Sequence, residues 1–187
     1  MTSSKNILSP EYALLGLLAQ QPAHGYDLYQ KLVTDLGQIW HISQSQVYNV
    51  LNRLEEQKLI KGKTQEQSKL PARRIFQITT EGRRRFESWF HASSGTSVRA
   101  IRVEFFTRLY FAQARDPEVA AQLLEAQLAE TGQGLTQLKN MLADSPDDQI
   151  FNRLGLELRI HQLASISDWL TTCQQILGTK KKTSNKK

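Results

Sequence analysis

The sequence lacks several features that mark whole classes of protein. It has one cysteine, Cys173, so an intramolecular disulfide is excluded, as is usual in a reducing cytoplasm. It has no run of about 18 apolar residues that could span a membrane, and its start, MTSSKNILSP, lacks the apolar stretch of a secretory signal. We therefore expect a cytoplasmic protein without a membrane partner.

The sequence also has little that could support catalysis or hold a cofactor. Four histidines and one cysteine are too few and too scattered for a metal site, and no phosphate-cradling glycine loop occurs. Cys173 lies on an apolar stripe with no neighbouring base, and Glu157 lies one helical turn before His161, which is typical of a surface pair. We expect no enzyme activity, no metal and no cofactor.

Basic charge is present, and it is unevenly distributed along the chain. The net charge is +6. Residues 53–85 hold ten Lys and Arg against four Glu, whereas residues 91–179 hold seven basic and ten acidic residues. A basic region in one half of a chain favours a polyanionic partner, most often nucleic acid, and the alternative is a solvated surface. The last residues, 179–187, contain five lysines and predict a disordered tail.

The first 90 residues contain both helix and strand signals. Three helices are predicted from LSPEYALLGLLAQQ, YDLYQKLVTDLG and ISQSQVYNVLNRLEEQKLI, and the third begins with a capping box formed by Ser43 and Gln46. LIKGKTQ and ARRIFQIT predict a β-hairpin, and TTEGRRRFESWF predicts a fourth helix. This order is the layout of a winged helix-turn-helix, which we expect over residues 8–91.

The second half predicts helices and no sheet. After a linker, helices are expected at 98–114, 117–143 and 147–177. The middle helix has leucines at heptad spacing, and the last has an apolar side. These wide apolar faces favour a helical domain at 97–178 that forms a homodimer, and the alternative is an intramolecular three-helix bundle. The expected dimerisation residues are Leu124, Leu128, Leu135, Leu138, Leu142, Leu156, Ile160, Leu163 and Leu170.

Four short motifs make residues 8–90 resemble the PadR family of bacterial transcriptional regulators. They are HGY after a leucine-rich helix, SQVYNVLNRLEE, PARR before the second strand, and TTEG at the fourth helix. By length and pattern, the helical half resembles the dimerisation region of the larger PadR subgroup. Many members have glycine where this chain has Ser45 and Lys58, and the second change could alter the turn there.

The resemblance implies a mainly α, winged-helix regulator that binds double-stranded DNA as a homodimer. PadR-like proteins are generally repressors, and some respond to small aromatic or amphipathic compounds. A two-fold symmetric dimer predicts a pseudo-palindromic operator. The competing functions are a winged-helix adaptor that binds protein and a DNA-binding protein without sequence preference. A polar third helix beside a basic wing argues against the adaptor.

The third predicted helix carries the residues expected to read bases. Opposite its apolar side lie short uncharged hydrogen-bonding side chains, which suit base edges in the major groove. Recognition helices contact bases mainly through their N-terminal residues. The expected DNA-contacting residues here are Gln44, Ser45, Tyr48, Asn49, Asn52 and Arg53. Tyr48 has the alternative roles of binding a phosphate or covering the helix end.

Phosphate contacts are expected from the hairpin and from the start of the second helix. The basic hairpin residues are Lys61, Lys63, Lys69, Arg73 and Arg74. Strand alternation places the two arginines on opposite faces, so we expect one of them to meet DNA. At His24 and Gly25, free backbone N–H groups either hold a phosphate or only make a turn. We expect Tyr26 in the core, and structural roles for Arg83, Arg84 and Arg85.

An aromatic-rich region at the junction of the two halves is the candidate effector pocket. Its residues are Trp89, Phe105, Phe106, Tyr110 and Trp169. A ligand that binds a DNA-incompetent dimer more tightly would shift the population off DNA. The alternative is that these side chains are ordinary core.

Overall fold

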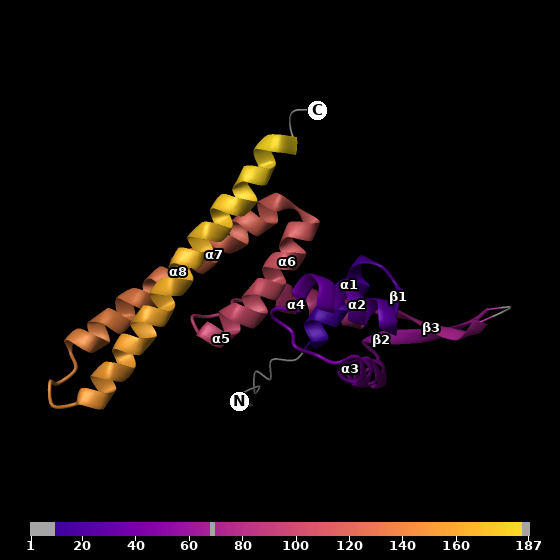
Figure 1. Ribbon diagram of the computed structural model, residues 1–187, viewed down its shortest axis with the longest axis horizontal. Helices are drawn as coiled ribbons and strands as arrows, with labels where there is room; N and C mark the ends of the chain where they lie inside the picture. Colours follow the sequence, from indigo (N-terminus) through magenta and orange to yellow (C-terminus); the bar gives the residue numbers. More distant parts are fainter. Residues whose placement is uncertain (1–9, 68–69, 185–187) are drawn as a thin grey trace. The chain divides into compact units, whose positions relative to one another are not determined.

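The computed structural model describes residues 10–67 and 70–184, and the side chains among them except those of 65–73 and 179–184. The chain divides into two compact units, Met1–Ala92 and Ser93–Lys187. The elements of the first unit are α1 (Glu11–Gln20), β1 (Ala23–His24), α2 (Gly25–Leu36), α3 (Gln44–Glu56), β2 (Ile60–Gln67), β3 (Leu70–Ile78) and α4 (Thr80–Phe90) (Figure 1). The second unit contains α5 (Val98–Ala100), the π-helix η1 (Ile101–Phe105), α6 (Phe106–Arg115), α7 (Pro117–Ala143) and α8 (Ile150–Ser184). The predicted fold, a winged helix-turn-helix followed by a helical region, is confirmed.

Helix α1 forms the centre of the core of the first unit. Its sequence ALLGLL is apolar on every side, as expected of a helix that is buried all round. It packs against α2, α3, α4 and β3. Its fully buried members are Ala13, Leu14, Leu15, Leu17 and Leu18. Because α1 occupies the centre, α3 lies at the surface with one face inward and the other exposed.

The three strands form an antiparallel sheet in the order β1–β3–β2. The hairpin of β2 and β3 was predicted, with Lys61 opposite Gln77 and Lys63 opposite Ile75. Strand β1 was not predicted, because two residues are too few to show an alternating pattern. Its pairing of His24 with Ile75 attaches the start of α2 to the hairpin.

The turn from α3 into β2 contains Lys58 with a φ of 59°. This is the left-handed conformation, which costs an L-residue about 1–2 kcal/mol. The backbone N–H groups of Lys58 and Leu59 donate to the carbonyl oxygens of Glu55 and Leu54. The chain therefore makes a left-handed turn of the kind that favours glycine, and it does so with a strained lysine.

Thr79 and Gly82 join the end of the hairpin to α4. The Thr79 hydroxyl accepts from the Gly82 N–H at 3.0 Å and donates to the Leu59 carbonyl oxygen at 3.0 Å. A Cβ on Gly82 would lie 2.0 Å from that same carbonyl oxygen. The TTEG motif therefore has a steric reason, because the first turn of α4 is pressed against the backbone of Leu59.

The second unit is helical as predicted, with two differences in its boundaries. The helix expected at 98–114 contains the π-turn Ile101–Phe105, for which the sequence has no recognised signal. The last helix begins at Ile150 and continues to Ser184, so it enters the segment 179–187 that was expected to be a disordered tail. The side chains of that segment, and all of residues 185–187, lie outside the described part of the chain.

Helices α7 and α8 lie side by side as an antiparallel hairpin (Figure 1). Their shared seam corrects one part of the dimer prediction. Leu124, Leu138, Leu163 and Leu170 are buried by their own chain, so they are not available to a second copy in this structure. The heptad pattern was real, but its partner is the neighbouring helix. The other expected dimer residues, Leu128, Leu135, Leu142, Leu156 and Ile160, are half-buried.

Candidate nucleic-acid interface

The start of α3 is fixed by the predicted capping box. The Gln46 N–H donates to the Ser43 hydroxyl at 3.3 Å, and the Ser43 N–H donates to the Gln46 side-chain oxygen at 2.8 Å. The inner face of the helix, Val47, Leu51 and Leu54, is fully buried. The Gln46 side chain is therefore hydrogen-bonded at the helix start, and the face opposite the buried residues points outward.

The outer face of α3 is exposed and uncharged over its first three turns. The exposed hydrogen-bonding residues are Gln44, Ser45, Asn49 and Asn52. Their side chains form no hydrogen bond with another described residue, so their donors and acceptors face solvent. These four residues, which were all expected to read bases, therefore lie on one surface.

Tyr48 is placed differently from those four residues. Its ring covers Gly25 at the start of α2, where a Cβ would lie 2.7 Å from ring atom Cε1 and 3.0 Å from the hydroxyl oxygen. This contact explains why HGY and the α3 tyrosine occur together, since a larger residue at position 25 would displace the ring. Tyr48 remains 36% exposed, so its hydroxyl can still meet an external partner beside the helix start.

Arg53 has an internal partner that the sequence did not indicate. Its Nε donates to Glu11 Oε1 at 2.8 Å, and Arg85 approaches Glu11 Oε2 at 3.3 Å. Glu11 is 8% exposed, and a buried carboxylate that loses a cationic partner is strongly destabilising. Arg53 therefore attaches α3 to α1, although its side chain stays 48% exposed.

Arg74 is also engaged, on the inner side of the hairpin. Its Nη2 donates to both carboxylate oxygens of Glu55, at 2.8 and 2.7 Å, and its guanidinium lies over the Phe76 ring. Glu55 Oε1 accepts the Gly62 N–H at 2.8 Å, and a Cβ at Gly62 would lie 2.4 Å from Arg74 Nε. This cluster ties the end of α3 to both strands, so Arg74 holds the wing in place.

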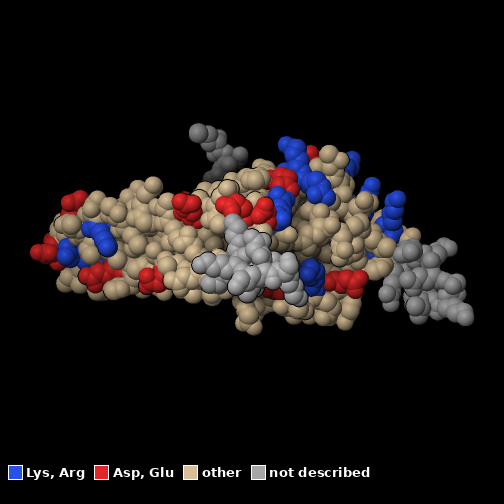
Figure 2. All heavy atoms as spheres, turned by 90° about the horizontal axis from the view of Figure 1, so that it is seen from above, with Lys and Arg blue, Asp and Glu red and all other residues tan. Residues whose placement is uncertain are grey.

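The other basic hairpin residues have different environments. Lys61 and Lys63 are exposed on the same face of β2, two residues apart. Neither has an ion pair with another described residue. Lys69, and the side chain of Arg73, lie outside the described residues. On the face shown in Figure 2, Lys and Arg side chains gather over the first unit, while the α7–α8 hairpin presents broad uncharged areas.

The arginines of α4 have structural partners, as expected. Arg83 donates to the Ala19 carbonyl oxygen at 3.1 Å, and Arg85 donates to the Gln57 side chain at 3.0 Å. Arg84 hydrogen-bonds Glu81, and this contact lowers the pKa of that carboxyl. Arg83 and Arg85 thus connect α4 to its surroundings in the first unit, whereas the Arg84 contact lies within α4.

A pocket of about 410 Å³ lies at the start of α2. Its lining includes His24 and Gly25 of the helix start, Asn52 of α3 and Arg74 of β3. The His24 ring Nδ1 lies 3.2 Å from the Arg74 carbonyl oxygen. The prediction that Tyr26 lies in the core is wrong, because it lines this pocket and is 52% exposed. Tyr26 is the tyrosine of HGY at a helix start, where a single residue has no periodic pattern that shows which way its side chain faces.

The expected effector residues belong to two separate aromatic clusters. In the first unit, Trp89 stacks on Tyr12 with ring centroids 4.7 Å apart. In the second unit, Phe105 and Phe106 pack against Trp169, at 6.3 and 6.0 Å. Trp89 and Phe105 are buried, and Tyr110 has an edge contact with Phe111. Trp89 and Phe105 are therefore core side chains, whereas Phe106, Tyr110 and Trp169 are half-buried. The effector pocket stays a prediction.

The second unit exposes apolar side chains that the sequence did not single out. Ile150, Phe151, Leu154 and Leu158 follow one another along the first turns of α8, and Phe151 is 87% exposed. Met141 of α7 is 53% exposed. The heptad pattern drew attention to the buried seam instead, because periodicity alone does not distinguish a seam within the chain from one between chains.

Neither a metal-binding cluster nor a membrane-spanning helix is found among the described residues. Among them, no group of three or more His, Cys, Asp or Glu side chains is arranged to hold a metal ion. No described helix is both long and apolar enough to cross a bilayer. Burial raises the pKa of the Cys173 thiol, which disfavours the nucleophilic thiolate.

Comparisons with known proteins agree with the arrangement of the first unit. Residues 14–88 match the family described as transcriptional regulator PadR-like family, and residues 101–178 match the family described as virulence activator alpha C-term. The chain is 26% identical over 129 residues to the negative transcriptional regulator PadR of Bacillus subtilis, covering 69% of this chain and 70% of the relative. A probable transcriptional regulator of Mycobacterium tuberculosis is 26% identical over 78 residues, or 42% of this chain and 41% of the relative. The crystal structure of Bacillus subtilis PadR in complex with operator DNA aligns at 23% identity with a TM-score of 0.45, covering 89% of this chain and 98% of that one.

Proposed function

We propose that this chain, whose residues 14–88 match the PadR-like family of transcriptional regulators, represses transcription as a homodimer on a pseudo-palindromic DNA operator. The observation that carries the proposal is the division of α3. Its inner face is fully buried, and its outer face presents exposed amide and hydroxyl groups beside a hairpin with two exposed lysines.

The outer face of α3 is suited to reading bases in the major groove. Asn49 and Asn52 lie one turn apart, and an asparagine side chain can bond bidentately to adenine N6 and N7. Gln44 and Ser45 lie in the first turn, from which recognition helices make most base contacts. We assign base recognition to these four residues, since none of them has a structural partner within the described part of the chain.

We assign phosphate contacts to fewer residues than the sequence predicted. Lys61 and Lys63 carry free charge on one face of β2, which suits contact with the DNA backbone. Arg53 and Arg74 are committed to Glu11 and Glu55, so we assign them a positioning role. They hold α3 and the wing at a fixed angle to each other, which both must keep to meet one DNA duplex.

The start of α2 can add one phosphate contact. The first N–H groups of a helix have no intrahelical partner and favour anions, and Tyr48 places its hydroxyl beside Gly25. Asp27 also lines this pocket and would repel a phosphate. The alternative, that His24 and Gly25 only form the turn, predicts that Tyr48→Phe leaves DNA affinity unchanged.

The homodimer is proposed from the exposed apolar side chains of α8. Two copies joined there would carry two α3 helices, and half-sites one DNA turn apart would require these to lie roughly 34 Å from each other. Repression is proposed because the Bacillus subtilis relative is a negative regulator. Release by a small effector remains part of the proposal.

A fluorescence titration with DNA from upstream of the protein's own gene tests the proposal. Asn49→Ala should lower the preference for this DNA over random DNA, since a lost bidentate base contact costs about 1–3 kcal/mol. Lys63→Ala should weaken binding to both DNAs alike and reduce the salt slope by about 1. Asn140→Ala, an exposed asparagine on α7, is the matched control and should change neither quantity.

Three outcomes would overturn parts of the proposal. An intact promoter preference in Asn49→Ala would show that α3 reads DNA with other residues or not at all. Equal, salt-dependent binding of promoter and random DNA by the wild type would favour a protein without sequence preference. Absence of DNA binding would favour the protein-binding adaptor.

A further inference from the structure

We propose that Glu11 is a specificity-determining residue for DNA binding, because it withholds two arginines from the phosphates of random DNA. Glu11 is the first residue of α1 and is 8% exposed. Its carboxylate lies between Arg53 of α3 and Arg85 of α4, all within the first unit. The inference rests on the proposed function, in which α3 enters the major groove. It assigns to a buried side chain a share in the choice between operator and random DNA.

Each carboxylate oxygen of Glu11 holds a different arginine. Arg53 Nε and Nη2 lie 2.8 and 2.7 Å from Oε1, and Arg85 Nη2 donates to Oε2 at 3.3 Å. Through Nη1, Arg85 also donates to the Gln57 side-chain oxygen at 3.0 Å, and its guanidinium lies over the Tyr12 ring. Both guanidinium groups are therefore held on the first unit by defined contacts.

Arg53 lies on the same side of α3 as residues to which we assigned base recognition. It follows Asn52 directly and lies one turn beyond Asn49, and all three residues are exposed. The Arg53 side chain is 48% exposed in spite of its ion pair, and the Arg85 side chain is 38% exposed. A DNA phosphate beside the groove therefore competes with Glu11 for the Arg53 guanidinium.

This competition favours Glu11, because its carboxylate is buried. If Arg53 moved to a phosphate, the buried carboxylate would keep one cationic partner instead of two. Removing a partner from a buried charge is costly. A phosphate contact is stabilised mainly by the release of counterions, and it weakens as the salt concentration rises. We therefore expect Arg53 to stay with Glu11 when the protein meets DNA.

Withholding these charges favours operator DNA over random DNA. Phosphate contacts strengthen binding without reading sequence. On random DNA the protein can take the position that gives the most phosphate contacts, whereas base contacts fix its position on an operator. Arginines released from Glu11 would therefore add more to the affinity for random DNA than to the affinity for the operator.

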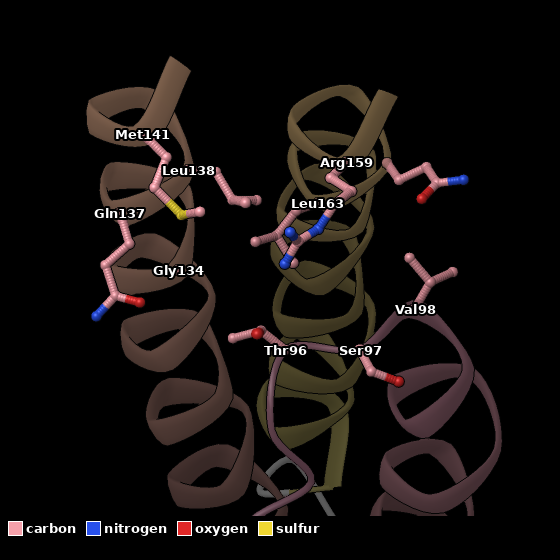
Figure 3. A pocket seen from close by; sticks show the side chains of 10 residues that line it. Thr96, Ser97, Val98, Gly134, Gln137, Leu138, Met141, Arg159 and Leu163 are labelled. Carbon is pink, nitrogen blue, oxygen red and sulfur yellow. The ribbon is translucent and has the colours of Figure 1, made fainter. Parts of the chain in front are cut away.

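Pairing with a carboxylate is a feature of the arginines around α3 and does not extend to every arginine of the chain. Arg74, which approaches the end of α3 from β3, is held by Glu55. In the second unit, Arg159 extends from α8 and forms no ion pair with another described residue. The residues that line the same pocket include no Asp or Glu (Figure 3). The carboxylates beside α3 therefore neutralise arginines at the proposed DNA-binding surface.

Glu11→Gln tests the inference in the full-length protein, titrated by fluorescence with random DNA and with DNA from upstream of its own gene. Both released arginines are partly exposed, so the variant buries no unpaired charge and should fold, as circular dichroism can check. At low salt, random DNA should bind about tenfold more tightly. The slope of log K against log salt should steepen by about 1, the contribution of one phosphate contact. The upstream DNA should gain less, so the preference for it should fall.

Two further variants separate this effect from net charge and from structure. Glu81→Gln changes the net charge equally and releases Arg84, whose pair lies entirely on α4, so it should leave both affinities near those of the wild type. Arg53→Gln should leave the salt slope unchanged while Glu11 is present, and it should abolish the gain when combined with Glu11→Gln. The expectation for Arg53→Gln alone keeps the inference testable if Glu11→Gln does not fold.

Three results would overturn the inference. They are an affinity of Glu11→Gln for random DNA that stays the same or falls, a gain of equal size on the upstream DNA, and a shallower salt slope in Arg53→Gln alone. The first of these would leave Glu11 with a purely structural role. A wild type that prefers the upstream DNA would keep the proposed function in all three cases, whereas a wild type without that preference would remove the proposed function and the role in specificity together.

Discussion

The two units of this chain differ in how completely each buries its own apolar residues. Among the described residues of the first unit, the large exposed apolar side chains are Tyr26, Val33 and Tyr48, and Tyr26 and Tyr48 line the pocket at the start of α2. In the second unit, α8 alone exposes five: Ile150, Phe151, Leu154, Leu158 and Ile176. The described part of the first unit thus buries most of its large apolar side chains. The second unit presents apolar surface of the kind that marks an interaction site.

Their glycines differ in the same way. Gly25, Gly62 and Gly82 of the first unit each lie where a Cβ would meet another group within 3 Å. Gly132, Gly155 and Gly178 of the second unit have nothing within 4 Å of that position. Crowded glycines therefore lie mainly in the first unit, whereas these three glycines of the second unit have no steric reason and weaken long helices. Gly134 is a crowded exception in the second unit.

The largest expected effect is that of Gly82→Ala. The added Cβ would overlap the Leu59 carbonyl oxygen, and forcing α4 away from the hairpin should destabilise the protein by about 3 kcal/mol. Urea unfolding followed by circular dichroism measures this loss. Gly155→Ala, in open space on α8, is the control and should lose no stability. Equal midpoints for the two variants would remove the steric contrast between the units.

The next effect concerns association and tests whether the exposed apolar side chains of α8 meet a second copy. Phe151→Ser should weaken the dimer by about 2 kcal/mol, the size of an interface hot spot, and sedimentation equilibrium would detect the larger monomer fraction. Val33→Ser alters an exposed apolar residue of the first unit and should leave association unchanged. A wild-type monomer, or equal dissociation constants for both variants, would contradict the dimer surface.

A smaller gain in stability is expected from Gly132→Ala. It lies in open space on α7, so alanine should stabilise the helix by up to about 1 kcal/mol. Gly134→Ala, two residues later, should fail to gain, because its Cβ would lie 2.9 Å from Thr96 Cγ2 and 3.1 Å from Leu163 Cδ2. Thermal unfolding of both variants compares an open with a crowded glycine on one helix. Identical shifts would show that the crowding at position 134 is relieved without cost.

The smallest effect is expected from Lys58→Gly. Glycine relieves the left-handed strain of this turn but adds freedom to the unfolded chain, so the net stabilisation should be about 0.5–1 kcal/mol. Lys58→Ala removes the charge and keeps the strain, and should remain close to the wild type. A gain in both variants would assign the effect to the lysine charge instead of the backbone.

The predictable parts of this protein were those with local causes. The capping box at Ser43, the TTEG start of α4 and the limits of α7 follow from residues near one another in sequence. The outer face of α3 followed from helical periodicity. Strand β1 and the π-turn at Ile101–Phe105 were missed, because a two-residue strand and a single widened turn carry no periodic pattern.

The parts that were misplaced depend on contacts between distant residues. Arg53 and Arg74 looked like free cations until Glu11, 42 residues away, and Glu55, 19 residues away, were found beside them. Tyr26 looked like core, and the leucines of α7 looked like a dimer seam. In each case the residue type indicated which kind of contact the side chain makes, but not which residue it contacts.

Local patterns thus specified the helices, the hairpin, the basic character of the first half and the polar face of α3, because capping, periodicity and charge act over a few residues. The choice of partners for those surfaces was decided by the tertiary structure. The packing of α7 against α8 determines which apolar residues of these helices remain exposed. The position of the buried Glu11 determines that Arg53 and Arg85 form ion pairs within the first unit. The physical reason is that burial and ion pairing depend on distances in space, which a single sequence does not record.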